Sequence, residues 1–526
     1  MTLSVLKKIR VIVSLVFLLA TTIVFLDFRN IIPDSWIKTL LYFQFIPSLL
    51  NFFSSSLAIA ASGFIVILVL SFLFGRIYCS FFCPLGTMMD IISRISEKFK
   101  KRKIFRFSKA RNLYRYGFLG LTIIFLFMGT TILVNLLDPF SNYGRIAANI
   151  GKPLLLYLNN GLSFLLEKMN IYTIYREEFI LPDWTILLFP LSFLMLIIYF
   201  ATFHGRLYCN TVCPVGTILG LLSRFSLFKI KMFKTSCTSC GDCSSTCKAS
   251  CIDIRNCTVD MSRCVACYNC LSSCPEGGIS YELSGFHKTI KQNPSGDKSK
   301  RKALQILFTF LIAAIPLKSM TQGRHRRGRP HTDGTIPIHK KHPVTPPGSK
   351  GLFHFTTLCT SCHLCVTSCP TKVLQPSLFE YGFEGILQPH LDSNAGFCNY
   401  DCVICGQVCP SAAIHTLTLT EKHKTQIGKV QLVLDNCVVF TRHKDCGSCA
   451  EHCPTQAVHM IPWKKNLKIP EINNEICVGC GACEYACPTK PYKAIYVEGN
   501  PIHLIAKKAE SKQTEQIFSP KEDFPF

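Results

Sequence analysis

Six cysteine quartets constrain this 526-residue chain more than any other feature. Four of them have the spacing Cys-x-x-Cys-x-x-Cys-x-x-x-Cys, which ligates cubane 4Fe-4S clusters, and five of the six end in Cys-Pro. Two clusters are therefore predicted in a first group of quartets, and four in a second. The first group is Cys237, Cys240, Cys243, Cys247 and Cys264, Cys267, Cys270, Cys274. The second group is Cys359, Cys362, Cys365, Cys369; Cys398, Cys402, Cys405, Cys409; Cys437, Cys446, Cys449, Cys453; and Cys477, Cys480, Cys483, Cys487.

Three other chemistries compete for these thiols. Zinc knuckles use two Cys-x-x-Cys pairs, and a triplet with a distant Cys-Pro fits that pattern poorly. Disulfides would suit a domain outside the cytoplasm, but four copies of one ligand spacing favour clusters. Cys359 to His363 also spell the Cys-x-x-Cys-His signature of haem attachment. Two further cysteines and a Pro in register favour a cluster there, so no haem is expected. His363 is then a polar neighbour that could adjust the reduction potential of the cluster.

The fourth cysteine of each quartet is expected to cross to a partner site. In two-cluster ferredoxins a triplet holds one cluster, while the fourth cysteine ligates the other. Cys274 should therefore complete the first site, and Cys247 the second. Lys248 stands where Pro is usual, and Cys251 and Cys257 are spare. Cys251 remains an alternative to Cys247 as a ligand.

Long apolar runs before residue 204 predict a membrane half. The chain is 48% hydrophobic with a mean hydropathy of +0.28, which is high for a soluble protein. A helix needs about 20 apolar residues to cross a bilayer of about 30 Å. Four to five spans are expected: Val11–Leu26, Leu57–Phe74, Gly117–Leu137, Trp184–Phe203 and the shorter Ala303–Leu317.

The distribution of charge predicts the orientation of these spans. Lys and Arg favour the cytoplasmic side, which places the N-terminus and the basic loop after Arg76 inside, while the segment 138–183 suits the outside. Most of the net charge of +25 is then explained by basic residues that mark the cytoplasmic side of the membrane. Nucleic-acid binding would need a basic face on a soluble module, so no such partner is expected.

An internal repeat lies at the cytoplasmic ends of the second and fourth spans. "FGRIYCSFFCPLGT" (74–87) and "HGRLYCNTVCPVGT" (204–217) share Gly-Arg-x-Tyr-Cys-x-x-x-Cys-Pro-x-Gly-Thr. The i, i+4 spacing of each cysteine pair places both thiols on one helical face, so four thiols from two symmetric helix ends could meet. The alternative is that the motif only ends the helices and the thiols stay reduced. The candidate catalytic residues are Cys79, Cys83, Cys209, Cys213 and His204.

His204 and two arginines have competing roles at the membrane edge. His204 replaces Phe74 of the first repeat and is a candidate proton acceptor, since histidine titrates near neutrality. A simple interfacial histidine is the alternative. Arg76 and Arg206 could hold either a quinone oxygen or a lipid phosphate.

These patterns divide the chain into five regions. Residues 1–230 form a transmembrane domain with two hairpin repeats, and residues 231–284 a cytoplasmic two-cluster domain. Residues 285–350 hold a basic region, the fifth apolar segment and a tether rich in Pro, Gly and His. Residues 351–505 form a four-cluster domain with a strand after each Cys-Pro closure, and residues 506–526 a tail. The expected fold is an α-helical membrane protein with ferredoxin-like α+β domains.

The membrane half resembles NapH, the membrane partner in periplasmic nitrate reduction, through its paired Cys-x-x-x-Cys-Pro motifs and two-cluster insert. The cysteine half resembles NapG, a four-cluster periplasmic partner, through Pro-Pro-Gly at 346–348 and its four quartets. This resemblance implies menaquinol oxidation in the bacterial inner membrane and electron flow from the quinone pool to a periplasmic redox protein or terminal reductase. It also implies folded export of the second domain, for which "SKRKALQ" (299–305) resembles a twin-arginine signal.

The resemblance bears on cluster pairing and leaves two rivals. In the four-cluster subunits of molybdoenzymes, outer quartets exchange with outer and inner with inner, which predicts nested exchange here. CcoG-like copper reductases and NosR-like electron donors share the membrane half. A copper reductase would not need the four-quartet domain, and the short N-terminus leaves no room for the flavin domain of NosR.

Overall fold

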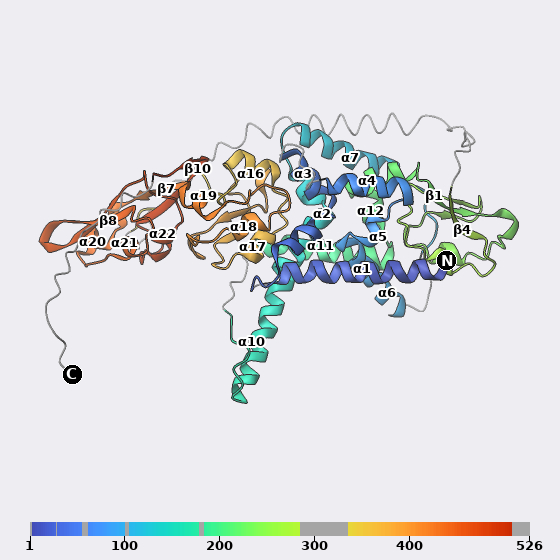
Figure 1. The fold of residues 1–526 in the computed structure, drawn as a ribbon, viewed down its shortest axis with the longest axis horizontal. Coiled ribbons are helices and arrows are strands. Elements are labelled where there is room, and N and C mark those ends of the chain that lie inside the picture. The colour runs from blue at the N-terminus through green and yellow to red at the C-terminus, as the bar shows by residue number, and fades with distance from the viewer. Residues whose placement is uncertain are drawn as a thin grey trace.

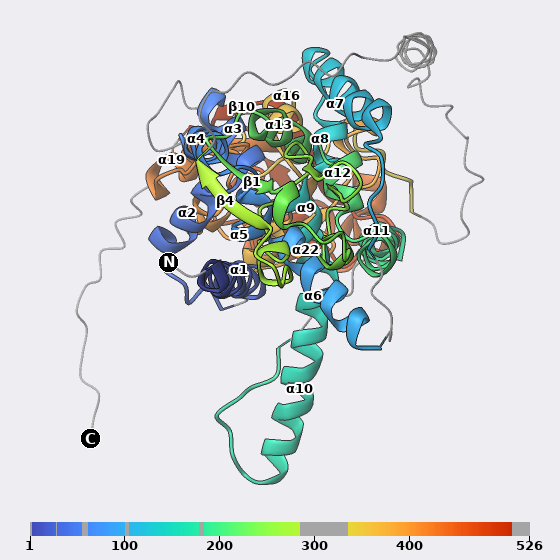
Figure 2. The ribbon, with the colours of Figure 1, turned by 90° about the vertical axis from the view of Figure 1, so that its right-hand side faces the viewer.

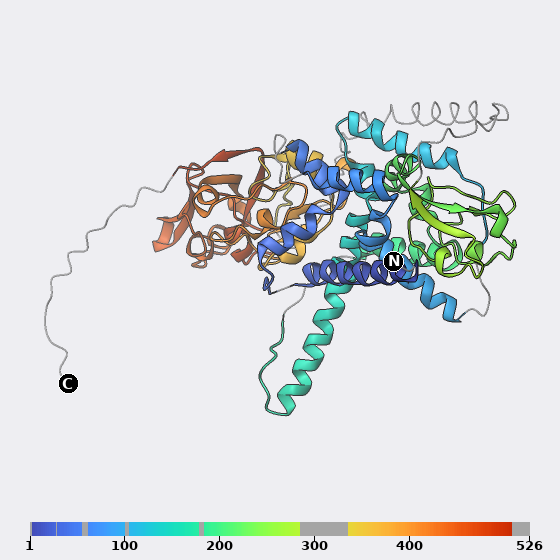
Figure 3. The ribbon, with the colours of Figure 1, turned by 45° about the vertical axis from the view of Figure 1, so that its right-hand side comes forward.

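The computed structural model describes residues 3–27, 29–54, 62–99, 105–177, 184–283 and 335–507. Figure 1 shows three parts along its long axis, with helices in the middle and a cysteine-rich part at either end. We call residues 3–227 the helical part, residues 228–283 the first cysteine domain and residues 335–507 the second cysteine domain. Figure 3 shows the same order from another side.

The helical part contains helices of very different lengths, because glycine, proline and polar residues interrupt its apolar runs. Its helices are α1 (Leu3–Leu26), α2 (Asp34–Tyr42), α3 (Phe45–Ser54), α4 (Gly63–Phe74), α5 (Tyr78–Phe81), α6 (Pro84–Phe99), α7 (Asn112–Phe127), α8 (Ile132–Leu137), α9 (Pro139–Ile146), the π-helical turn η2 (Ala147–Gly151), α10 (Lys152–Lys168), α11 (Trp184–Phe203), α12 (Leu207–Thr211) and α13 (Pro214–Ser223).

Two described helices are long and apolar enough to cross a membrane by length and composition. They are Val5–Leu26 within α1, and α11, which matches the predicted span Trp184–Phe203. In the described part of Leu57–Phe74, α4 is shorter, with 12 residues. The segment Ala303–Leu317 and the export motif at 299–305 lie outside the described residues.

The predicted span Gly117–Leu137 is wrong as a continuous helix. Its first part belongs to α7, which ends at Phe127, and α8 begins at Ile132. Gly129 lies between them in the left-handed conformation with φ +79°, which suits glycine because it has no Cβ and which commonly ends a helix. An apolar run of sufficient length is therefore broken by one residue.

Several helices were not predicted. Asp138 ends α8 and caps α9, and its carboxylate accepts the Ser141 backbone N–H at 2.8 Å. A π-helical turn follows, and α10 then projects away from the rest of the molecule in Figures 1 and 2. The segment 138–183 was expected only as a loop outside the membrane.

The first cysteine domain contains two small antiparallel sheets. β1 (Phe228–Met232) pairs with β4 (Ile279–Leu283) from Phe228 opposite Leu283 to Met232 opposite Ile279, and β2 (Ile252–Asp253) pairs with β3 (Thr258–Val259). The single-turn helix α14 (Asp242–Ser245) lies between β1 and β2 in sequence. These strands hold the loops that carry the cysteines.

The second cysteine domain repeats a unit of cysteine loop, short helix and strand. The strand predicted directly after the Cys409 closure is wrong, because a helix at Leu419–Lys424 comes first and the strand begins only at Thr425. Its strands form three antiparallel pairs: β5 (Leu374–Pro376) with β6 (Pro389–Leu391), β7 (Thr425–Leu432) with β10 (Ile495–Ile505), and β8 (Val458–Pro462) with β9 (Lys468–Ile472). Its helices are α16 (Leu352–Leu358), α17 (Leu364–Ser368), α18 (Ile404–Gln407), α19 (Leu419–Lys424), α20 (Val438–Arg442), α21 (Ser448–Glu451) and α22 (Ala482–Ala486).

The helical part contacts both cysteine domains directly. On the first-domain side, the Lys7 ammonium donates to Ser272 Oγ at 2.9 Å. On the second-domain side, the Lys152 ammonium donates to the Thr367 carbonyl at 2.6 Å, and Thr131 Oγ1 donates to the Thr356 carbonyl at 3.0 Å. The helix α1 runs from the first domain toward the second, with its N-terminus labelled at the first-domain end of Figure 1.

Candidate functional site

The two sites of the first cysteine domain have exchanged their fourth cysteines, as predicted. One small cavity is lined by Cys237, Cys240 and Cys243 together with Cys274. A second cavity is lined by Cys264, Cys267 and Cys270, joined by two cysteines of the first quartet region, Cys247 and Cys251. We call these cavities site 1 and site 2. Apart from the thiols, apolar side chains and backbone form most of both linings.

Site 2 holds five thiols where a cubane cluster uses four. Cys247 and Cys251 lie with their sulfurs 3.5 Å apart. The hydrogen bond from the Cys251 thiol lowers the pKa of Cys247 to about 7, whereas the contacts with Cys247 and Cys264 raise the pKa of Cys251 well above its ordinary value. A thiolate is the form that binds iron. The geometry thus favours Cys247 as the ligand and Cys251 as its hydrogen-bond donor.

In the second cysteine domain each quartet exchanges with its sequence neighbour, so the nested exchange expected from the resemblance is wrong. One cavity joins Cys369 to the triplet Cys398, Cys402, Cys405, and another joins Cys487 to Cys437, Cys446, Cys449. We call them site 4 and site 6. The β5–β6 pair lies between the first two quartets of this domain and the β8–β9 pair between the last two, so each pair folds the chain back between the quartets that exchange.

The remaining two groups follow from the electrostatics of the thiols. Burial raises the pKa of Cys359 and Cys365, and repulsion from Cys409 raises it further, which places Cys409 beside the first triplet of this domain. Burial also raises the pKa of Cys477, with Cys453 adding to the shift. We call these groups site 3 (Cys359, Cys362, Cys365, Cys409) and site 5 (Cys477, Cys480, Cys483, Cys453).

Sites 3 to 6 form a series that leads away from the helical part. Site 3 lies nearest, since the backbone of α9 at Gly144 comes so close to the Cys362 carbonyl that an added Cβ would stand 2.4 Å from it. Sites 4 and 5 are joined by a hydrogen bond from the Cys398 backbone N–H to the Cys480 carbonyl at 2.9 Å. Site 6 adjoins α20 and α21, at the far end of Figure 1.

His363 links site 3 to the helical part. Its Nδ1 lies 2.9 Å from Asn149 Nδ2 in the π-helical turn, and its Nε2 lies 2.8 Å from the Leu387 carbonyl. Burial lowers the pKa of His363 to about 3, so the ring is neutral, donates from Nε2 to Leu387 and accepts from Asn149 at Nδ1. Both ring nitrogens are thus engaged within the protein fold.

The cysteines of the internal repeat meet as expected, but they do not share a helix face. Cys79 and Cys209 lie in α5 and α12, whereas Cys83 and Cys213 lie after the ends of those helices. Each of the latter precedes a proline, which drives the preceding residue toward extended backbone and starts a new helix. All four thiols are free and buried. We call them the thiol centre.

Electrostatic contributions among the thiols of the centre indicate that they lie near one another. Burial raises the pKa of Cys83 well above its ordinary value, and Cys209 and Cys79 raise it further. Burial likewise raises the pKa of Cys213, with Cys209, Cys79 and Cys83 all adding to the shift. Each pair therefore acts on the other across the interface of the two repeats.

Arg76 and Arg206 cross between the two repeats. Arg76 Nη2 donates to the Cys209 carbonyl at 3.0 Å and lies 3.7 Å from Cys79 Sγ. Arg206 Nη1 donates to the Cys79 carbonyl at 2.8 Å and lies 3.9 Å from Cys209 Sγ. Both side chains are 0–1% exposed, so neither reaches a lipid phosphate at the surface. Their positive charges adjoin the thiol centre.

One buried carboxylate fixes this arrangement to the first cysteine domain. Asp90 of α6 contacts Arg10 at 2.8 Å, Arg206 at 3.0 Å and Lys248 at 3.6 Å. Burial alone would raise the pKa of Asp90, but the charges of Arg206, Lys248 and Arg10 outweigh it and hold the pKa well below its usual range. The carboxylate thus joins α1, α6, the turn before α12 and the first domain.

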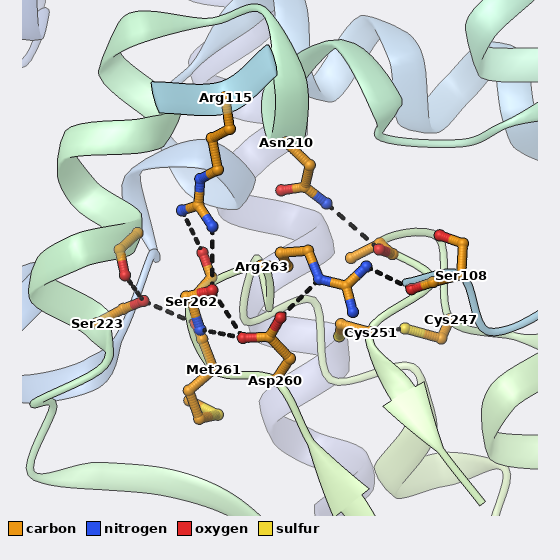
Figure 4. Close-up of polar contacts among 12 residues, drawn as sticks. Ser108, Arg115, Asn210, Ser223, Cys247, Cys251, Asp260, Met261, Ser262 and Arg263 are labelled. Carbon is orange, nitrogen blue, oxygen red and sulfur yellow. Dashed lines mark hydrogen bonds and ion pairs between the residues drawn. The ribbon is translucent and has the colours of Figure 1, made fainter. Parts of the chain in front are cut away.

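A second polar contact, drawn in Figure 4, docks the loop before site 2. Arg115 of α7 donates to the Ser262 carbonyl at 2.7 Å and to its hydroxyl at 3.0 Å. Asp260 accepts from Arg263 at 2.7 Å, and Arg263 also donates to the Ser108 carbonyl at 2.7 Å. The loop that carries Cys264 is therefore held against the helices.

The structure does not bring His204 to the thiol centre. His204 is exposed at the end of α11, where its ring lies against Tyr199 and Phe200. Sequence reasoning also missed Asp90, Asn149 and Asp138. Only Asp138 had a local signal, the Asp-Pro pair that caps α9. The partners of Asp90 and Asn149 are distant in sequence, so no local pattern could reveal them.

Comparison with protein families identifies iron-sulfur domains in four segments of the chain. A family described as a 4Fe-4S binding domain matches residues 57–103 and 186–232, the two hairpin repeats. Two families described as 4Fe-4S dicluster domains match residues 358–414 and 442–490. The two dicluster matches enclose the first two quartets of the second cysteine domain and most of its last two quartets. This division agrees with the exchange between neighbouring quartets.

Curated relatives carry electron-transfer names. The ferredoxin-type protein NapF of Escherichia coli is 26% identical over 30% of this chain and 87% of its own length. The putative electron transport protein YccM of Escherichia coli is 23% identical over 48% of this chain and 61% of its own length. The methylamine utilization ferredoxin-type protein MauN of Paracoccus denitrificans is 29% identical over 33% of this chain and 48% of its own length. No solved structure matches the chain. The chain thus carries ferredoxin-type 4Fe-4S domains, and iron-sulfur electron transfer is the role that these relatives support.

Proposed function

We propose that this chain is a membrane-bound iron-sulfur protein that takes electrons from menaquinol and delivers them to an acceptor outside the cytoplasm, such as a nitrate reductase or another terminal reductase. One observation carries the proposal: cysteine sites stand at both ends of the molecule, with helices between them (Figure 1). The proposed localisation is the bacterial inner membrane.

Exposed apolar side chains support a membrane around the helical part. One stripe of α1 exposes Ile12, Val16, Leu19 and Ile23, each by more than half. The helix α11 has a similar stripe, with Leu188 66% and Met195 63% exposed. Large apolar patches of this kind mark contact with lipid or protein, because water solvates them poorly.

The basic residues support the proposed orientation. Lys7, Lys8 and Arg10 lie at the first-domain end of α1, where positive charge favours the cytoplasm. At the other end of α1, Asn30 donates to the Ser368 carbonyl of the second domain at 3.4 Å. The first cysteine domain then lies in the cytoplasm and the second outside it.

The grouped thiols fit 4Fe-4S clusters. Each of sites 1, 3, 4, 5 and 6 brings together a triplet and a crossed fourth cysteine, which is how two-cluster ferredoxins divide their ligands. Site 2 does the same with Cys247 and has Cys251 in addition. When bound, clusters supply one-electron redox chemistry. The protein around them excludes water and sets their potentials by burial and hydrogen bonding.

The helical part contributes the contact between the two ends. Asn149 holds His363 in one tautomer, next to Cys362 of site 3. Arg145 in α9 donates to Asn142 Oδ1 at 2.9 Å, and its charge opposes protonation of His363. The backbone of α9 at Gly144 also abuts the Cys362 carbonyl of the site 3 loop.

The test is to mix oxidised, anaerobically purified full-length protein with a reduced short-chain menaquinol and to follow the electron paramagnetic resonance (EPR) signals of the clusters. Rapid appearance of reduced-cluster signals is expected. A reduced naphthoquinol that lacks the isoprenoid chain serves as the control for reduction outside a quinol site. Absence of reduction by menaquinol, while dithionite still reduces the clusters, would overturn the proposal.

A cupric reductase is the second candidate, favoured by the all-thiol composition of the thiol centre, because soft thiolates suit cuprous ion. Dithionite-reduced protein would then be reoxidised promptly by cupric ion, while the oxidised protein would remain unreduced by menaquinol. That pair of results would replace the quinol proposal with the copper one.

A further inference from the structure

The two hairpin repeats raise a problem of ligand number. Each matches the family described as a 4Fe-4S binding domain, over residues 57–103 and 186–232. Yet each matched segment contains only two cysteines, Cys79 and Cys83 in one and Cys209 and Cys213 in the other. A 4Fe-4S cluster takes four cysteine thiolates. Neither copy can therefore bind a cluster with its own cysteines.

The fold removes the problem by bringing the two pairs together. All four sulfurs are buried in one core, with residue exposures of 3–5%. Within the described part of the chain, no three Cys, His, Asp or Glu side chains converge closely enough to hold a single metal ion. A cubane cluster requires wider spacing than a single ion, because each sulfur binds a different iron atom. The four cysteines of the thiol centre match the number of thiolates that one cubane cluster takes.

The surroundings of the thiol centre also suit a negatively charged group. The Gly86 and Gly216 backbone N–H groups point at Cys83 Sγ and Cys213 Sγ, at 3.4 and 3.3 Å. Hydrogen bonds to the ligand sulfurs and nearby positive charge are what stabilise a reduced cluster. A Cβ on Gly86 would stand 2.5 Å from Arg206 Nη1, and one on Gly216 would stand 2.7 Å from Arg76 Nη2. Glycine at both positions lets the guanidinium groups reach the centre.

We propose that Cys79, Cys83, Cys209 and Cys213 together bind one 4Fe-4S cluster, shared between the two repeats. This would be a seventh cluster, in addition to the six predicted from the quartets. It deepens the proposed electron transfer, but it does not depend on menaquinol being the donor.

The seventh cluster would lie between site 2 and site 3. On one side, Ser80 of α5 donates to the Val265 carbonyl, between Cys264 and Cys267 of site 2, and Arg76 donates to the Ser262 carbonyl at 3.3 Å. On the other side, Tyr208 adjoins Cys209, and its hydroxyl donates to the Leu137 carbonyl at 2.8 Å. Leu137 ends α8 and is followed by α9, whose Gly144 abuts Cys362 of site 3.

The role of such a cluster is that of a relay. One electron passes at a time, so one neighbour is oxidised as the next is reduced, and no bond is made or broken. With this cluster in place the cysteine sites run from site 1 to site 6 through the helical part. Without it, the helical part separates two unconnected cluster domains.

The test uses the double variant C83S/C213S in the full-length chain, produced and purified anaerobically. Serine keeps a side-chain acceptor for the Gly86 and Gly216 N–H groups, so the caps of α6 and α13 are retained. The matched control is C257S, because Cys257 is outside every quartet and lines neither of the first-domain cavities, although its thiol neighbours Cys237 of site 1. We expect the double variant to lose about four irons and four sulfides per chain and one reducible EPR signal, and the control to lose none.

The six other clusters report on folding in the same sample. If the double variant keeps every iron, every sulfide and every EPR signal of the native protein, the proposal is wrong and the thiols form a dithiol pair or remain free. Loss of zinc or copper in place of iron would equally overturn it. Loss of all clusters together would mean that the variant fails to fold, and the next variant then decides.

The second variant is G86A/G216A, which keeps all four thiols. An added methyl group would press on Arg206 and Arg76 and also on the backbone carbonyl oxygens of Cys79 and Cys209, so the guanidinium groups and the backbone beside the thiols must shift. We expect the iron content to stay at the native value, and the midpoint potential of one EPR signal to shift while the others stay. No shift in any signal would contradict a cluster at this place. Because both readouts use dithionite, neither outcome depends on the menaquinol test.

Discussion

Asp90 is a buried carboxylate that three buried cations contact. Its carboxylate faces Arg10, Arg206 and Lys248, with side-chain exposures of 1–9%. We expect D90N to cost about 3–5 kcal/mol of stability, because it leaves buried charges without a partner. Thermal unfolding of the detergent-solubilised protein, followed by circular dichroism, measures the loss.

The matched control for D90N is E167Q. Glu167 pairs with Arg176 at 2.5 Å, but the side chain of Arg176 is 54% exposed and that of Glu167 33%. An ion pair of this kind contributes about 0–1 kcal/mol. Equal losses in the two variants would mean that Asp90 does not hold the cations together.

His503 makes the second cysteine domain sensitive to acid. Burial and the neighbouring His354 lower the pKa of His503 to about 4, while the unfolded chain protonates near 6.5. As pH falls from 6.5 to 4, His503 becomes protonated in the unfolded state but stays neutral in the folded state. Its contribution to the free energy of unfolding is therefore fully present above pH 6.5 and declines as the pH falls toward 4. For this partly exposed ring the loss is about 2 kcal/mol.

The variant H503Q removes this proton site. Gln can still bond to Thr345, whose hydroxyl lies 2.7 Å from His503 Nε2. We expect the unfolding temperature of H503Q to fall less between pH 7 and pH 4.5 than that of the native protein. H459Q, at an exposed His–Glu pair, should follow the native profile. Parallel profiles for H503Q and the native protein would rule out His503 as the group responsible.

At the scale of elements, the exchange between neighbouring quartets has a spectroscopic consequence. C369S and C402S should remove or alter the same EPR signal, since both residues line site 4. C409S and C362S should alter a different, common signal, since both belong to site 3. Nested exchange would instead make C369S match a variant of Cys477, Cys480 or Cys483, and that result would contradict the structure.

Some elements were predictable from the sequence for a clear physical reason. α11 matches its predicted bounds because its apolar run contains no glycine, and Pro190 within it did not end the helix. The crossing of Cys274 and Cys247 followed from ligand spacing alone. The run 117–137 failed because Gly129 breaks the helix, and a hydropathy pattern averages over a single residue.

Other features were beyond any local pattern. The spacing within a quartet does not identify its partner, so the sequence alone could not say which quartets exchange. The i, i+4 spacing of the repeat cysteines predicted one shared helix face. The proline after Cys83 and after Cys213 prevents this, because the first helix ends before each of these cysteines. The Asp90 contacts span 80 to 158 residues of sequence, and the Asn149–His363 contact spans 214.

At the scale of the whole molecule, Gly144 controls the fit between the helical part and site 3. An added Cβ would stand 2.4 Å from the Cys362 carbonyl and 2.7 Å from the Phe25 ring. We expect G144A to cost about 1–3 kcal/mol through overpacking and to slow electron arrival in the second cysteine domain, at unchanged iron content. Rapid-freeze EPR measures this rate after addition of a reductant that acts only on the first cysteine domain.

G161A in α10 is the control for this variant. No atom lies within 4 Å of the added Cβ at that glycine, and alanine favours the helix. Stability and transfer rate should stay at or above the native values. If G144A behaves like G161A, the contact at Cys362 does not govern the fit of the two parts.

The 24 residues of α1 run from one cysteine domain toward the other over about 36 Å, close to the thickness of a bilayer. An electron that travels this length inside a membrane also travels through the electric field across that membrane. Each charge moved through 100 mV does about 2.3 kcal/mol of electrical work. With the cell interior negative, outward flow through this chain would discharge the membrane, whereas inward flow would have to be driven. The protein would therefore act as a conductor whose throughput depends on the voltage as well as on its redox partners.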